Sequence, residues 1–200
     1  DMTKFRFFLR QIRFRIVHPL YQKLLVFRLR HKKEINVVFI ASSLSMWRYQ
    51  HIYELLSRHS RFKTSIVIVP FISYSHDQQN SDVYVLKRYF DSNNIKYYIG
   101  GCDESFDIRE NLKPDVLFYP QPYSGVHSDK DEYYSFRDRL LCYYPYAFWM
   151  SKGDWSYNEL LHNYAWKLFY STELHRIDAK KYAENKGRNV FFALPLILGI

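Results

Sequence analysis

Hydrophobic residues in this chain form short continuous runs that are separated by stretches with helical spacing. INVVFIA, which starts at Ile35, and TSIVIVP, which starts at Thr64, are two such runs. Continuous apolar runs of this length are typical of parallel strands that are buried on both faces. Further runs of strand length begin at Ile95, Val116 and Leu140, with shorter ones over 167–171 and 189–192.

The segments between these runs carry the spacing of amphipathic helices. Ile52, Leu55 and Leu56 fall on one side of a helix predicted over 47–59. Other helices are predicted around Leu86 and over 106–112, 158–166 and 173–185. Strands that alternate with helices indicate an α/β fold, here a Rossmann-like, doubly wound and mostly parallel sheet.

The strand that starts at Val116 is central to the prediction and lies within KPDVLFYPQPY. Pro114 disfavours a helical conformation in the residue before it. Pro120 and Pro122 lack the backbone N–H groups that a continuing central strand needs, so the chain is predicted to leave the sheet near Gln121. Ligands bind at this carboxyl edge in open α/β sheets.

Charge is distributed unevenly along the chain, whose formal net charge is +9. Residues 1–33 carry ten Lys or Arg and one acidic residue, whereas residues 34–200 carry nineteen of each sign. We therefore divide the chain into a basic amphipathic segment, 1–33, and a Rossmann-like lobe, 34–200. The uncharged runs in the basic segment are far shorter than the roughly 20 residues that a membrane-spanning helix needs.

The basic segment has aromatic and basic residues at helical spacing, and Pro19 is predicted to break or restart its helix. Such a helix is the expected form of an anchor on an anionic membrane surface, here peripheral and at the cytoplasmic face of the cell membrane. The alternative is a helix that packs on the lobe's own apolar surface. Nucleic acid is not expected as a partner, because no recognition module accompanies the charge. The predicted membrane-binding residues are Phe5, Arg6, Phe8, Arg10, Ile12, Arg13 and Arg15.

Two loops carry candidate chemistry. The loop SSLSMW, from Ser42 to Trp47, contains no glycine, so it is neither a dinucleotide fingerprint nor a P-loop. Its serines either bind an anionic ligand or cap the following helix. The loop after the central strand holds His127 beside three acidic residues at 129–132, a mixture that can serve acid–base chemistry. Its spacing matches no metal signature, and a solvated loop is the simpler interpretation.

The segments INVVFIASSLSMWRYQHIYELL, IVIVP, LKPDVLFYPQPY, LLCYYPYAF and WKLFYST follow one another in this order. Together they resemble the amino-terminal half of the CDP-glycerol glycerophosphotransferase family, which is related to teichoic-acid polymerases. The similarity covers about Ile35 to Val190. Its most specific segments are PDVLFYPQPY and CYYPYAF.

The resemblance implies a two-lobed GT-B fold in which this chain is the acceptor-side lobe. A missing carboxyl-terminal lobe would bind the cytidine nucleotide, so no cofactor is expected in this fragment. The implied activity moves glycerol phosphate, or a similar phospho-polyol, from CDP-glycerol to a cell-surface glycan or teichoic-acid-like acceptor. The alternative is a non-catalytic Rossmann-like binding domain tethered to the membrane.

Two departures from the family pattern limit this inference. The family's histidine-glycine-threonine segment has no counterpart in YYPYAFWMSKGDW, which contains no histidine. The chain also stops at Ile200 after the uncharged FFALPLILGI, as expected of a sequence that is cut short.

Parallel strands place their carboxyl ends at one edge, so the loops 42–47, 70–74, 121–123 and 144–148 are predicted to converge there. Hydroxyl, amide and flat aromatic groups suit a polyol- or sugar-phosphate acceptor. His127 is the one nearby titratable candidate for a catalytic role. The predicted substrate-binding residues are Ser43, Trp47, Gln121, Tyr123 and Tyr146.

Overall fold

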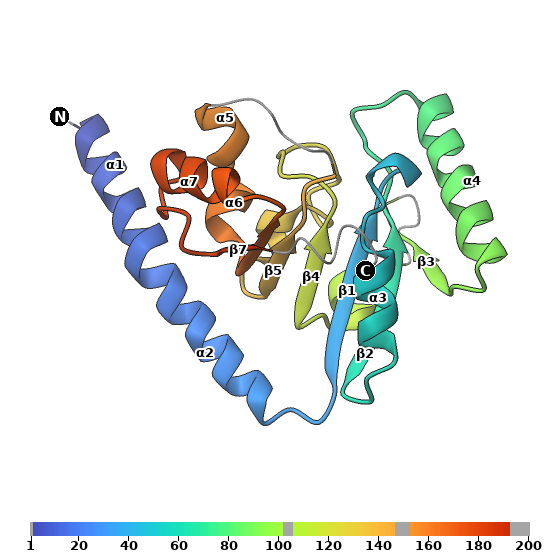
Figure 1. Ribbon diagram of the computed structural model, residues 1–200. Coiled ribbons are helices and arrows are strands. Elements are labelled where there is room, and N and C mark those ends of the chain that lie inside the picture. The colour runs from blue at the N-terminus through green and yellow to red at the C-terminus, as the bar shows by residue number, and fades with distance from the viewer. Residues whose placement is uncertain (1, 102–105, 147–152, 193–200) are drawn as a thin grey trace.

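The computed structural model describes residues 2–101, 106–146 and 153–192, which form one parallel sheet with helices on both faces (Figure 1). The strand order is β3-β2-β1-β4-β5-β6-β7, and all of the described pairs are parallel. The order changes direction between β1 and β4, so the doubly wound, Rossmann-like class is confirmed. The strands are β1 (Ile35–Ala41), β2 (Phe62–Ile68), β3 (Tyr97–Ile99), β4 (Val116–Tyr119), β5 (Leu140–Tyr143), β6 (Lys167–Tyr170) and β7 (Val190–Phe192).

The connections between strands are helical, as the spacing of apolar residues predicts. The helix expected from Trp47 begins later, at Gln50, because Trp47 itself has an extended backbone after a short 3-10 turn. The helical elements are α1 (Met2–Ile12), η1 (Arg13–Val17), α2 (His18–Arg30), η2 (Leu44–Met46), α3 (Gln50–Ser57), α4 (His76–Ser92), η3 (Ile108–Leu112), η4 (Tyr133–Phe136), α5 (Asp154–Tyr157), α6 (Leu160–Tyr164) and α7 (Glu173–Tyr182).

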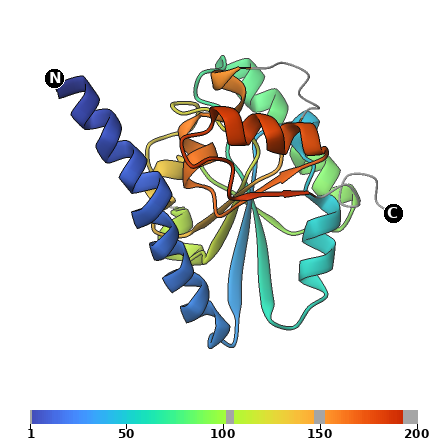
Figure 2. The ribbon, with the colours of Figure 1, turned by 60° about the vertical axis from the view of Figure 1, so that its left-hand side comes forward.

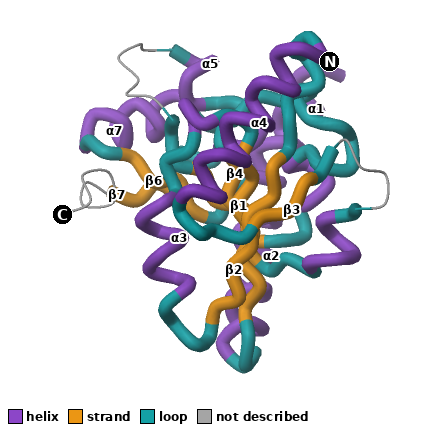
Figure 3. Tube along the Cα trace, turned by 90° about the vertical axis from the view of Figure 1, so that its right-hand side faces the viewer, coloured by secondary structure: helices purple, strands orange, loops and turns teal. Residues whose placement is uncertain are grey.

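Two cores lie on opposite faces of the sheet, because successive residues of a strand point to opposite sides. In β1, Val38 and Ile40 belong to one core, whereas Val37 and Phe39 belong to the other. Figure 3 shows α1 and α3 on different sides of the strands. Val38, Ile68 and Leu117 lie within runs predicted to be strands, and each is at most 1% exposed.

The elements α1, η1 and α2 follow one another as one long helix beside the sheet (Figure 2). Pro19 was predicted to break or restart this helix, and the second alternative is confirmed, since α2 begins at His18. Pro19 lies in the first turn of α2 and directly follows the π-helical turn η1. A proline is tolerated at such a position, because its missing N–H is not needed there. Among the described residues, no helix is long and apolar enough to cross a membrane.

One side of this long helix is bound to the lobe. Phe14 is 2% exposed and meets the ring of Tyr164 edge-on, with 5.1 Å between the ring centroids. The side-chain amide of Gln22 donates a hydrogen bond to the carbonyl oxygen of Tyr164 at 2.9 Å, and His18 Nε2 lies 2.9 Å from the same oxygen. The helix therefore packs on the lobe's own surface along this side.

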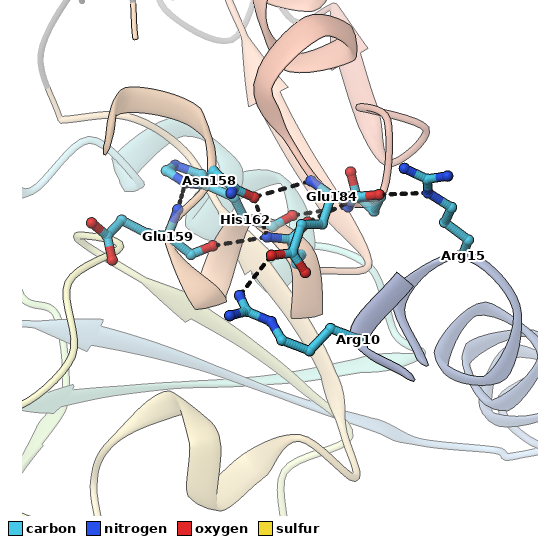
Figure 4. Close-up of polar contacts among 8 residues, drawn as sticks. Arg10, Arg15, Asn158, Glu159, His162 and Glu184 are labelled. Carbon is cyan, nitrogen blue, oxygen red and sulfur yellow. Dashed lines mark hydrogen bonds and ion pairs between the residues drawn. The ribbon is translucent and has the colours of Figure 1, made fainter. Parts of the chain in front are cut away.

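Two of the predicted membrane-binding arginines also contact the lobe (Figure 4). Arg10 forms an ion pair with Glu184 at 2.7 Å, and Arg15 donates to the carbonyl oxygen of Glu184 at 2.9 Å. Arg13 lies over the ring of Tyr164. These three arginines were predicted to bind the membrane, and in the structure each contacts the lobe. Phe5, Arg6 and Phe8 are exposed, and Ile12 is half-buried.

Candidate functional site

The crevice between β1 and β4 is the point at which the strand order reverses, and its inner part is filled by side chains from the end of β4 and from the loops after both strands. The hydroxyl of Tyr49, just before α3, donates to the carbonyl oxygen of Tyr119 at the end of β4. The hydroxyl of Tyr119 donates to the carbonyl oxygen of Asp131 at 2.8 Å. These bonds fix the loop after β4 against the start of α3.

His127 also belongs to this inner part. Its Nε2 lies 2.9 Å from Oγ of Ser42, and its ring stacks on Phe71 with 5.2 Å between the centroids. Only 1% of His127 is exposed, and burial lowers the pKa of this histidine to about 4. An acceptor molecule cannot reach the ring, so the structure does not support a catalytic role for His127 and gives it a structural one.

The acidic residues near His127 have structural contacts too. One carboxylate oxygen of Glu132 accepts hydrogen bonds from the backbone N–H groups of Val126 and His127, at 2.7 and 2.9 Å. Asp131 accepts from the Ser128 hydroxyl at 2.7 Å. Both acids are buried, so the expected solvated loop is an ordered turn. In the part of the chain that the structure describes, no three metal-ligating side chains are grouped.

Outside this buried layer, three loops meet at the carboxyl edge. Tyr123, after β4, and Tyr146, after β5, are joined by a side-chain hydrogen bond. Burial and this neighbour raise the pKa of Tyr123 to about 12, so its hydroxyl stays protonated at neutral pH. Arg48, in the loop before α3, donates through Nε to the carbonyl oxygen of Tyr146 at 3.3 Å. Arg48 is exposed, so its cation is available to a ligand at this edge.

Glu159 adds a carboxylate to the same edge. It precedes α6, where its backbone N–H donates to Nδ1 of the buried His162 at 3.0 Å and its carbonyl oxygen accepts from the N–H of His162 at 3.0 Å. Its charge acts on Tyr123, and burial raises the pKa of Glu159 above its ordinary value. Figure 4 shows its carboxylate directed away from the contact between Arg10 and Glu184. Arg48 and Glu159 were not singled out in the sequence, because neither lies in a motif.

Three predicted binding residues have more restricted surroundings than expected. Trp47 is 7% exposed and packs edge-on against Phe90, so its ring is part of a core and not a binding platform. The side-chain amide of Gln121 accepts from the N–H of Tyr123 and donates to its carbonyl oxygen at 3.1 Å. Ser43 is buried, and its hydroxyl lies 3.0 Å from that of Ser45. Within the predicted loop 144–148, Ala147 and Phe148 lie outside the described residues, as do residues 102–105 and 193–200.

This geometry defines the class of the chain as a doubly wound, Rossmann-like α/β fold. No protein-family model and no curated protein matches the sequence. A solved structure of similar fold is the crystal structure of UDP-N-acetylglucosamine 2-epimerase, with a TM-score of 0.50 and 14% sequence identity. The match covers 80% of this chain and 48% of the other, so this chain spans about half the length of that protein. At this identity the likeness shows the fold alone.

Proposed function

We propose that this chain is the acceptor-side lobe of a membrane-associated transferase. It would move glycerol phosphate, or a similar phospho-polyol, from a CDP-linked donor to a cell-surface glycan or teichoic-acid-like acceptor. The observation that carries the proposal is the meeting of Arg48, Tyr123 and Tyr146 with Glu159 at one sheet edge. A cation, two hydroxyls and a carboxylate are groups suited to a phosphorylated polyol.

In the proposed reaction, an acceptor hydroxyl attacks the β-phosphorus of CDP-glycerol. A phosphorus–oxygen bond forms, the bond from this phosphorus to the bridging oxygen breaks, and CMP leaves with the electron pair. Glu159 takes the proton of the acceptor hydroxyl, since its carboxylate is only half-buried and has a raised pKa. Arg48 binds phosphoryl oxygens, and the carboxyl-terminal lobe that the resemblance implies holds the nucleotide.

An anionic membrane surface is the partner proposed for the long amino-terminal helix. Phe5, Phe8 and Phe27 are each more than half exposed, beside many Lys and Arg. Exposed apolar side chains among cations favour the interface of an anionic bilayer. The proposed location is therefore the cytoplasmic face of the cell membrane, with peripheral attachment.

The experiment uses the protein translated from the complete reading frame, together with CDP-glycerol labelled in glycerol and membranes as the source of acceptor. The expected result is release of CMP together with incorporation of the label into lipid-extractable or polymeric glycan. UDP-N-acetylglucosamine serves as the comparison donor. If no label is incorporated, or if CDP-glycerol is not consumed, the transferase proposal is wrong.

A further inference from the structure

A basic pocket lies between α2 and the β6–β7 edge of the sheet, away from the carboxyl-edge loops. Its volume is about 620 Å³, and its charged lining residues are Lys23, Arg30, Lys167 and Arg188. No Asp or Glu is among its lining residues. Within the described residues, no carboxylate forms an ion pair with any of the four. Grouped cations without a protein counter-ion favour an anionic ligand.

The position of Lys167 makes this pocket unlike an ordinary solvated surface. Its ammonium group lies 3.2 Å from the centroid of the Phe191 ring and 5.0 Å from that of Trp166. Burial lowers the pKa of Lys167. A cation that is held among aromatic rings and partly removed from water is stabilised by an anion beside it.

An apolar cavity adjoins the basic pocket and is lined by residues of both α2 and α3. Its volume is about 400 Å³, and its floor is formed by strand residues such as Phe118, Cys142 and Phe169. Val26, Arg30 and Trp166 line both spaces, so the two are neighbours that share one wall. Each volume falls within the roughly 300 to 1,000 Å³ of typical ligand sites.

We propose that the basic pocket and the apolar cavity together hold one anionic phospholipid from the membrane. Its phosphate lies among the cations of the basic pocket, and an acyl chain enters the apolar cavity past Trp166. Two observations favour this occupant. The pocket is positively charged, and one of its walls is α2, whose Leu24 and Phe27 are exposed. The proposal extends the membrane contact proposed above and is independent of the transfer chemistry.

Short-chain lipids below their micelle concentration test the site without a bilayer. Dihexanoyl phosphatidic acid is titrated calorimetrically into the protein and compared with dihexanoyl phosphatidylcholine and inorganic phosphate. We expect the anionic lipid to bind at least 10-fold more tightly than either. The double variant Lys23→Glu, Lys167→Glu should lose this preference, whereas Lys87→Glu, an exposed change on α4, should keep it.

Leu55→Trp is the second test, because this exposed α3 residue lines the apolar cavity and a larger side chain there fills it. We expect the variant to bind the anionic lipid at least 10-fold more weakly, with an unchanged far-ultraviolet circular dichroism spectrum. Equal binding of both lipids, or unchanged binding by Leu55→Trp, would overturn the proposal. A dimer of the parent protein that Leu55→Trp dissociates would also overturn it, since a second copy would then be the occupant. These results leave the CDP-glycerol transfer assay unaffected, so the two proposals fail separately.

Discussion

The hydroxyl oxygen of Ser42 lies 2.9 Å from Nε2 of His127, and this contact joins the loop after β1 to the loop after β4. It occupies the inner part of the crevice where the sheet changes direction. A ligand at this edge therefore rests on the outer layer, which contains Arg48, Tyr123 and Tyr146.

The free energy of unfolding should decrease at acidic pH because of the buried His127. Burial lowers the pKa of His127 from 6.5 to about 4 in the folded protein. Between these values the unfolded chain binds a proton that the folded chain does not, so the free energy of unfolding decreases as pH falls from about 6.5 to about 4. At pH 5.5 this group lowers stability by about 1 kcal/mol relative to pH 7.5.

Urea unfolding at pH 7.5 and 5.5 checks this prediction, with His127→Gln as the variant. His162 has a pKa lowered to about 3 by burial and contributes a similar loss in both proteins. The variant should lose about 1 kcal/mol less than the parent over this interval. If the parent and His127→Gln lose the same unfolding free energy between pH 7.5 and 5.5, His127 does not cause the loss.

Phe14→Ala should destabilise the protein, and Phe8→Ala should not. Phe14 is buried against Tyr164, so its truncation is expected to cost about 3 to 5 kcal/mol, whereas truncation of the exposed Phe8 is expected to change stability by less than about 0.5 kcal/mol. In liposome co-sedimentation at low salt, Phe8→Ala should reduce binding to anionic vesicles. Equal stability of the two variants would contradict the observed docking of the helix.

Deletion of residues 1–33 tests the membrane proposal but also removes Phe14 from the core. We expect it to abolish co-sedimentation with anionic liposomes and to lower stability. If the shortened protein pellets with vesicles as well as the intact chain, the membrane proposal for this segment is wrong.

Gln121→Ala should affect stability, because its side-chain amide bonds both the N–H and the carbonyl group of Tyr123. Loss of these turn contacts is expected to cost about 1 to 2 kcal/mol. Thermal unfolding of Gln121→Ala and Tyr123→Phe checks this, since the latter keeps the ring and the turn. A stability of Gln121→Ala equal to that of the parent would contradict the structural role assigned to the amide.

Glu159→Gln should slow transfer and change its pH dependence. A base must lose its proton to act, and the pKa of Glu159 is raised by burial, so transfer by the parent should decline as pH falls toward this raised pKa. The variant should be slower at neutral pH and lack this acidic limb. A variant with the parental rate and profile would rule out Glu159 as the base.

The central strands were predictable from sequence because β1, β4 and β5 are continuous apolar runs that are buried on both faces. Val116–Tyr119 shows this most clearly, since all four of its residues are buried and prolines mark its ends. The starts of β2 and β3 differ by two residues from the predicted ones, at Phe62 and Tyr97. Strand ends depend on pairing with neighbours, which local sequence does not encode.

The candidate site was less predictable, because its members come from separate loops. Tyr123 and Tyr146 follow from the rule that carboxyl ends of parallel strands share an edge. Glu159 precedes a helix with no motif around it, and the packing of α6 decides its position. Trp47 was wrongly predicted to offer an exposed binding surface, because the sequence places it in a polar loop. In the structure its ring packs in the core.

The most direct test of the central claim is CDP-glycerol transfer by variants of the carboxyl edge. Arg48→Ala and Tyr123→Phe are compared with Arg58→Ala, a change at an exposed arginine that directly follows α3. The account predicts at least a 10-fold loss of kcat/KM for Arg48→Ala, a smaller loss for Tyr123→Phe and no loss for Arg58→Ala, with all three as stable as the parent to within about 1 kcal/mol. Parental transfer rates in both edge variants would contradict the assignment of this edge as the acceptor site.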